Sequence, residues 1–326
     1  MSGLSGFQLK WMRFIGRMPR ATKIEERRAA REALVERCLA YMESSDYKRH
    51  QECVALRDRG GETDDSVKED LRRIEKSSEY KWFQKQMKAG VLEGHEASRV
   101  EFFDDFGGGL DPQKWSTRFF WGDAQVGQAY SFVGDPHAYT DGANVSVANG
   151  RLVISTRRES VQSLAWDAKM GFLPREFDYT SGVVTTGHSF RMRRGTFEAK
   201  IRYTAQEGVY HAFYLVGDSA LPQIDVFRTV PGDDRVLSGV YCGSADSKHE
   251  ASVGKLPYSS EFFILSVEVG DSSLVWKING VAYLEQQVKL PKQPLYLVLL
   301  SGVAPGATPS GESKLEVDWV RCQGDM

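Results

Sequence analysis

The chain has 326 residues, of which 41% are hydrophobic and 11% aromatic, so it is long enough to bury a large core. Its formal net charge of −2 excludes a general nucleic-acid binder, because no basic excess is available to neutralise phosphates. No apolar run of about 18 or more residues occurs, so no membrane span is predicted. The four cysteines lack the spacing of zinc ligands, and no structural zinc is expected.

The first part of the chain, residues 1–97, is predicted to be helical. Between Lys23 and Met42 the apolar residues recur at steps of four, as on one face of an amphipathic helix. The stretch 44–51 is echoed by 77–84, and in both a serine precedes an acidic residue, which favours a helix start. This region therefore predicts two similar helical hairpins, and a protein partner could dock on such a helical arm.

A second domain, residues 98–326, is predicted to be all-β. About a dozen short segments with strand-like alternation follow one another, which is typical of an antiparallel sandwich. The clearest is Thr196–Tyr203, where Phe197, Ala199 and Ile201 alternate with charged residues. Further along, Asn279 and Gly280 separate two alternating segments, which is the strongest short-range hairpin signal.

The most informative strand runs from Gln223 to Arg228. Because strand side chains alternate between faces, Ile224 and Val226 should point into the core, and Gln223, Asp225 and Phe227 should point away from it. A bulge would instead bring Arg228 to the face of Asp225, where the two could form an ion pair. One face of this strand is therefore expected to be polar.

Several motifs in this order resemble those of glycoside hydrolase family 16, the laminarinase and lichenase family. The resemblance covers roughly residues 101–322 and rests on the segments 103–106, 110–115, 144–154, 179–182, 195–200, 208–214 and 317–321. It implies a concanavalin A-like jelly roll, two curved antiparallel sheets whose concave face holds a long open polysaccharide cleft. The expected fold is this all-β jelly-roll sandwich, preceded by a small α-helical region.

The catalytic motif of family 16 is where this chain departs from the resemblance. The family carries Glu-x-Asp-x-x-Glu, and this sequence reads Gln223-x-Asp225-x-x-Arg228. In retaining glycosidases one carboxylate attacks the sugar while a second, about 5–5.5 Å away, protonates the leaving oxygen. An amide cannot attack in this way and a guanidinium keeps its proton, so neither replacement suits the reaction. The resemblance makes Asp225 the helper between the two glutamates.

We therefore predict a pseudoenzyme that binds a polysaccharide or oligosaccharide with β linkages. Arg228 would suit a glycan that carries anionic groups. Aromatic rings stack on sugars, and a histidine could donate hydrogen bonds to their hydroxyls. The candidate glycan-binding residues are Trp121, Trp166, Tyr210, His211, Tyr214 and Tyr241.

Two alternatives stay open. One is an active endo-glycosidase that hydrolyses a β-glucan or galactan with displaced carboxylates, such as Asp218, Glu198 or Asp225 itself. The other is an interaction or scaffold protein that engages a partner through its helices. A carboxylate pair about 5–9.5 Å apart across the cleft would favour the enzyme, and exposed aromatic side chains along the concave face would favour the glycan-binding protein over the scaffold.

The resemblance also bears on metal content and compartment. Some family 16 enzymes hold a structural calcium with residues that Gly150 and Asp318 match, although calcium takes about six to eight oxygen ligands. No other cofactor is expected. The family acts on extracellular or periplasmic polysaccharides, whereas Lys10, Arg13 and Arg17 interrupt the apolar residues at the start of the chain, which does not read as a secretory signal. The sequence leaves the compartment open.

Overall fold

The computed structural model describes residues 8, 11–12, 14–15, 18–59, 64–94, 98–219, 221–231, 233–241, 248–255, 261–288 and 293–325. The chain divides into two compact units, one over Thr22–Arg99 and one over Val100–Asp325 that also includes the chain up to Ala21. The domain boundary between residues 97 and 98 stays a prediction. Among the described residues, no helix is long and apolar enough to cross a membrane.

The helical unit forms where the serine–acid pattern predicts helix starts. The Ser44 hydroxyl accepts a hydrogen bond from the Tyr47 amide (3.2 Å), and the Ser77 hydroxyl accepts one from the Tyr80 amide (3.1 Å), so each caps a helix. Cys38 packs in a small core of this unit. The helices are α2 (Ala21–Met42), α3 (Ser45–Asp58), α4 (Asp65–Lys76) and α5 (Ser78–Lys88).

The β unit contains one short helix, α6 (Phe120–Gln125), and a series of strands. The strands are β1 (Ser98–Asp104), β2 (Tyr130–Phe132), β3 (His137–Tyr139), β4 (Val145–Val147), β5 (Leu152–Asp167), β6 (Gly171–Ser181), β7 (Val183–Thr185), β8 (Gly195–Tyr203), β9 (Val209–Val216), β10 (Gln223–Val230), β11 (Asp233–Tyr241), β12 (Lys248–Lys255), β13 (Phe263–Val269), β14 (Ser273–Ile278), β15 (Val281–Gln287), β16 (Tyr296–Val303) and β17 (Ser313–Asp325).

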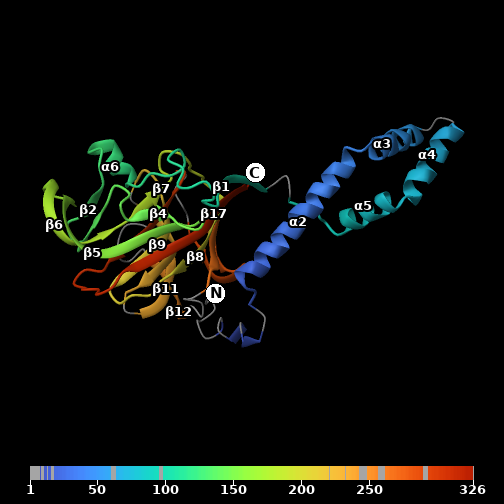
Figure 1. Ribbon diagram of the computed structural model, residues 1–326. Coiled ribbons are helices and arrows are strands. Elements are labelled where there is room, and N and C mark those ends of the chain that lie inside the picture. Colours follow the sequence, from blue (N-terminus) through green and yellow to red (C-terminus); the bar gives the residue numbers. More distant parts are fainter. Residues whose placement is uncertain are drawn as a thin grey trace. The chain divides into compact units, whose positions relative to one another are not determined.

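These strands form two sheets packed face to face, as Figure 1 shows. The six-stranded sheet has the order β12-β11-β10-β9-β16-β7. The larger sheet follows β15-β14-β13-β8-β17-β5-β6-β3, and in addition β1 pairs with β17 while β2 and β4 pair with β5. Most of the pairs whose register is described are antiparallel, whereas β2 pairs with β5 and β3 with β6 in parallel. The predicted all-β sandwich is confirmed.

The main core lies between the two sheets. Leu297 and Leu299 of the six-stranded sheet and Phe197 of the larger sheet belong to it and are fully buried. The alternation predicted for residues 196–203 is therefore confirmed, and so is the hairpin at Asn279, since β14 pairs with β15 around that turn. Met18, which precedes α2, is also buried in this core.

A second apolar cluster lies on the other face of the six-stranded sheet. The strand residues Val183, Ala212, Val298 and Leu300 alternate with those of the main core, so they point away from the larger sheet. They are buried by a layer that we call the aromatic cover, whose fully buried members are Phe119, Tyr130 and Tyr139. Part of the sheet face that was expected to carry an open cleft is thus a buried apolar core.

Candidate functional site

A bulge in β10 decides which side chains reach the polar face. Asp225 pairs with Tyr214, but Phe227 already pairs with the next β9 residue, Phe213, so one residue of β10 is extra. As a result Phe227 joins the main core, and the expectation that it points away from the core is wrong. Arg228 instead lies on the face of Asp225, as expected for a bulge.

Gln223, Asp225 and Arg228 form one hydrogen-bonded group, which we call the Asp225 cluster. The Gln223 side-chain amide donates to Oδ1 of Asp225 (2.6 Å), and Nε of Arg228 donates to Oδ2 (2.9 Å). The Asp225 side chain is fully buried. Burial alone would lower the pKa of Arg228, but the adjacent Asp225 carboxylate outweighs it and raises that pKa. Both oxygens of the only carboxylate in the motif are therefore occupied.

Two predicted glycan-binding tyrosines lie beside this cluster. Tyr214 is the β9 partner of Asp225, and Tyr210 lies on the same face of β9. The Arg228 guanidinium carbon is 5.6 Å from the centre of the Tyr210 ring, which is within cation–π range. Both rings are half-buried. The pairing of β10 with β9 thus brings together Gln223, Asp225, Arg228, Tyr210 and Tyr214.

His211 does not belong to this face, which corrects the sequence-based expectation. It alternates with Tyr210 on β9 and so points between the sheets, where it is 1% exposed. Its ring nitrogens contact the hydroxyls of Ser301 (2.7 Å) and Ser313 (3.1 Å). Burial lowers its pKa to about 4. His211 is therefore a satisfied interior histidine and cannot reach a glycan on the outer face.

The remaining predicted aromatic residues are more scattered. Trp121 lies in α6, half-buried, and its indole donates to the Asp218 carbonyl (3.1 Å). Trp166 lies on β5 and is 37% exposed, with its ring 6.1 Å from that of Phe132. Tyr241 ends β11 opposite Gln223, but its side chain lies outside the part of the chain that the structure describes.

The alternative carboxylates are not gathered at Asp225 either. Glu198 lies on β8, in the larger sheet, and Asp218 pairs with Arg191. Asp135, a carboxylate that the sequence analysis did not single out, instead influences Tyr210 beside the cluster. Burial raises the pKa of Asp135, and the charge of Asp135 in turn contributes, after burial, to raising the pKa of Tyr210. Its loop sequence, Gly134-Asp135-Pro136, carries no recognisable signal of this role.

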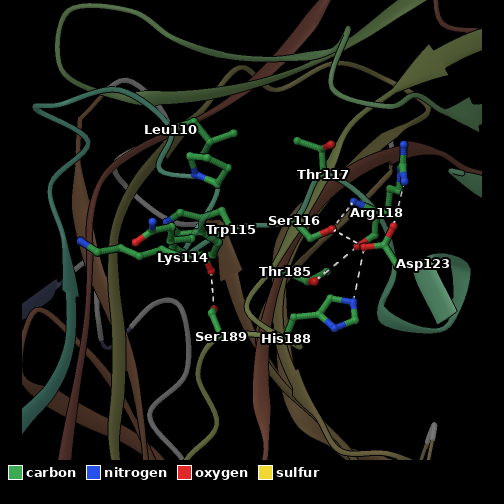
Figure 2. A pocket seen from close by; sticks show the side chains of 12 residues that line it. Leu110, Lys114, Trp115, Ser116, Thr117, Arg118, Asp123, Thr185, His188 and Ser189 are labelled. Carbon is green, nitrogen blue, oxygen red and sulfur yellow. Dashed lines mark hydrogen bonds and ion pairs between the residues drawn. The ribbon is translucent and has the colours of Figure 1, made fainter. Parts of the chain in front are cut away.

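A polar pocket of about 390 Å³ lies at the edge of the six-stranded sheet, where Ser116 pairs with Thr185 of β7. Figure 2 shows Asp123 on one side of it, joined to Ser116, Arg118 and His188. The Asp123 carboxylate accepts from the Ser116 hydroxyl (2.9 Å) and from Arg118 (3.0 Å), and His188 lies 3.4 Å away. Because the hydroxyl points at Asp123 and not at the imidazole, this group does not form a serine nucleophile with a histidine base.

The residues that match the family's calcium site do not fit that ion. One Asp318 oxygen accepts from Arg151 (2.9 Å) and the other is 2.8 Å from the Lys200 ammonium. Burial would raise the pKa of Asp318, but these two cations lower it overall. Gly150 lies in the turn between β4 and β5. Two positive side chains thus occupy the carboxylate that calcium would need.

Comparison with known proteins supports the resemblance. No family model matches the chain. The endo-1,3-1,4-beta-glycanase EglC of Rhizobium meliloti is 25% identical over 224 residues, which cover 64% of this chain and 47% of EglC. The clotting factor G alpha subunit of Tachypleus tridentatus is 24% identical over 56% of this chain and 28% of its own length. The chain spans about half the length of such relatives, or less.

Solved structures share the fold. The catalytic domain of an endo-1,3-beta-glucanase (laminarinase) from Thermotoga petrophila has a TM-score of 0.57 at 23% identity, covering 70% of this chain and 98% of that domain. The endo-beta-1,3-glucanase of Pyrococcus furiosus gives the same score at 22% identity, covering 70% and 95%. The β unit has the jelly-roll fold of these glucanases, and the chain resembles glycoside hydrolase family 16 in sequence and in fold.

Proposed function

From this resemblance to family 16 glucanases, we propose that the protein binds a β-linked glycan at the Asp225 cluster and does not hydrolyse it. The proposal rests on one observation above all: Gln223 and Arg228 each donate a hydrogen bond to Asp225, one on each oxygen. A carboxylate that accepts two such bonds, one from a cation, is a poor nucleophile, because its charge is already neutralised.

The neighbours of the cluster suit sugar binding. Tyr210 and Tyr214 offer partly exposed rings on the same face, and rings of this kind pack against the apolar faces of sugars. Since Asp225 neutralises Arg228, the cluster carries no net positive charge, and we expect a neutral glycan in place of the anionic one that the sequence suggested. The names of the similar proteins make β-1,3-glucan and β-1,3-1,4-glucan the first ligands to try.

A second candidate function is hydrolysis with a displaced acid, and Asp135 is the observation in its favour. Its raised pKa would let it hold a proton at a higher pH than an ordinary aspartate, as a general acid must. The enzyme would then use Asp225 and Asp135 in place of the family's two glutamates. Substitution Asp135→Asn would abolish sugar release in that case.

The test measures binding and cleavage together on a panel of neutral and anionic polysaccharides. We expect binding to a β-glucan with no growth of reducing ends. Tyr210→Ala and Tyr214→Ala should weaken binding by about 0.5–1.5 kcal/mol, the range for favourable ring contacts. The matched control is Phe103→Ala, because Phe103 is an exposed aromatic residue on β1 of the other sheet. Steady release of oligosaccharides that disappears in Asp135→Asn would establish the enzyme instead.

A further inference from the structure

The strand pairings place the Asp225 cluster in two rows of side chains that run across the six-stranded sheet. Asp225, Tyr214, Val298 and Thr185 are successive partners on β10, β9, β16 and β7. The second row contains Arg228, Ala212, Leu300 and Val183. A glycan that crosses the strands at Asp225 would have to follow these rows toward β7.

On the β7 side the rows are closed. Val183, Ala212, Val298, Leu300 and Thr185 are each at most 4% exposed, although they point away from the larger sheet. The aromatic cover lies on them as part of one apolar cluster. Since neighbouring strands are about 4.8 Å apart, the buried part of the first row begins roughly 10 Å from Asp225, at Val298.

The cover is a packed layer, with its own internal contacts. The ring of Phe119 lies 5.0 Å from that of Tyr139 and 5.6 Å from that of Tyr130, as ring centres. The Tyr139 amide donates to the Ser131 hydroxyl (2.7 Å). The hydroxyls of Tyr139 and Tyr210 also share a hydrogen bond, next to the Asp225 cluster. The cover therefore reaches the edge of the proposed site.

Charged groups and strand pairing hold the cover in place. The cover comes from the segment 118–141. Its last residue, Asp141, accepts hydrogen bonds from Nε of Arg118 (2.7 Å), at the start of the segment, and from the Ala129 amide (2.7 Å). β2 and β3, which carry two of the rings, pair with β5 and β6. Displacing this layer would expose a large apolar surface to water, which is unfavourable in proportion to the area.

On the opposite side the row continues without a large side chain. The β11 partner of Asp225 is Gly239, which has none. Gly239 is itself buried, so what decides how a sugar can lie at the cluster is the packed wall toward β7. A ligand that is blocked on one side must end there, in contrast to the middle of a polymer, which leaves the site on both sides.

We infer that the Asp225 cluster binds the terminus of a glycan chain, or a short oligosaccharide, and not an internal segment of a polysaccharide. This inference rests on the proposed glycan binding. It differs from the long open cleft that the family resemblance implies, because the aromatic cover fills the part of the face on which such a cleft would continue.

The experiment titrates the whole protein with β-1,3-glucan chains of two defined lengths and measures the number of proteins bound per chain by calorimetry. One protein per chain at both lengths is expected, with equal affinity per mole of chain. Two blocked forms of the short chain provide the control, one with a bulky aromatic amine at the reducing end and one with a benzylidene acetal at the other end. One block should weaken binding by about tenfold or more, or roughly 1.4 kcal/mol, and the other should not.

Binding of several proteins to each long chain, or full affinity for both blocked forms, would overturn the inference and leave glycan binding itself intact. Absence of binding to β-1,3-glucan, β-1,3-1,4-glucan and every other member of the polysaccharide panel would overturn the proposed function, and the inference with it.

Discussion

At the scale of single residues, the Asp225 cluster shows how polar groups can be retained in a buried place. Asp225 is fully buried, where a carboxylate without partners costs several kcal/mol. Gln223 and Arg228 provide them. By resemblance, these two positions would carry the catalytic glutamates. In this chain their side chains instead stabilise a buried aspartate.

This arrangement predicts a large effect of removing the cation. Arg228→Ala leaves a buried carboxylate without its partner, and the free energy of unfolding should fall by about 3–5 kcal/mol. The double variant with Asp225→Asn should recover part of that loss, since the charge is gone as well. The control is Arg202→Ala, which breaks the more exposed pair with Glu316 and should cost about 0–1 kcal/mol. Urea unfolding compares these three variants with the unaltered protein; equal losses for Arg202→Ala and Arg228→Ala would contradict the argument.

Two buried histidines, His137 and His211, should make the free energy of unfolding depend on pH. Burial lowers the pKa of His137 to about 3 and that of His211 to about 4, below the ordinary 6.5. The unfolded chain then binds more protons than the folded one between these values. Stability from each histidine is fully present above about pH 6.5 and is lost as pH falls, by about 1.4 kcal/mol per unit.

Unfolding free energies measured between pH 7 and pH 4 check this slope. His211→Gln should reduce it whatever its effect at neutral pH, and His188→Gln should not, because His188 is half-exposed beside Asp123. An unchanged slope in His211→Gln would show that other groups set the acid sensitivity.

At the scale of elements, local sequence patterns predicted the secondary structure correctly where residues close in the chain determine it. The alternation in β8, the Asn279 turn and the serine caps of α3 and α5 all formed as expected. The orientation of Phe227 did not, because it depends on where the β10 bulge lies against β9. Such a register is set by long-range pairing, which alternation within one strand does not contain.

The caps allow a matched test within each serine pair. Ser44→Ala and Ser77→Ala each remove a hydroxyl that accepts a backbone amide, and each should lower the free energy of unfolding by about 1 kcal/mol. Ser45→Ala and Ser78→Ala, one residue on and exposed, should change it little. Chemical unfolding followed by circular dichroism compares them. Larger losses at the second serine of each pair would place the helix starts one residue later.

At the scale of the whole molecule, the sequence predicted the sandwich and the motif residues, and missed how the outer face is filled. The aromatic cover joins Phe119, Tyr130 and Tyr139 to residues of β7, β9 and β16, far away in the chain. Asp318 likewise meets Arg151 and Lys200 from two other parts of the sandwich, where the resemblance suggested calcium. Neither set has a spacing that could reveal it before folding.

The predicted β domain, residues 98–326, is expected to fold by itself with a measurable loss of stability. Residues 98–326 contain every strand that the structure describes, but removing residues 1–97 also removes Met18 from the main core. We expect a cooperative domain whose unfolding free energy is lower by about 2–5 kcal/mol, as for truncation of a buried methionine. Met18→Ala in the full chain should reproduce most of this loss in thermal or urea unfolding. A molten truncated domain beside an unaffected Met18→Ala would point to a different contact.

The bonds at Asp225 also constrain how this sequence can evolve. Replacing Arg228 by glutamate alone would remove the cation that pairs with a buried carboxylate and add a second negative charge beside it. Replacing Gln223 alone would supply one acid, which the two-carboxylate reaction cannot use. Each single substitution toward the family's motif therefore either lowers stability or adds no catalytic function. Selection would oppose or ignore both single changes, so a return to the motif requires the two together.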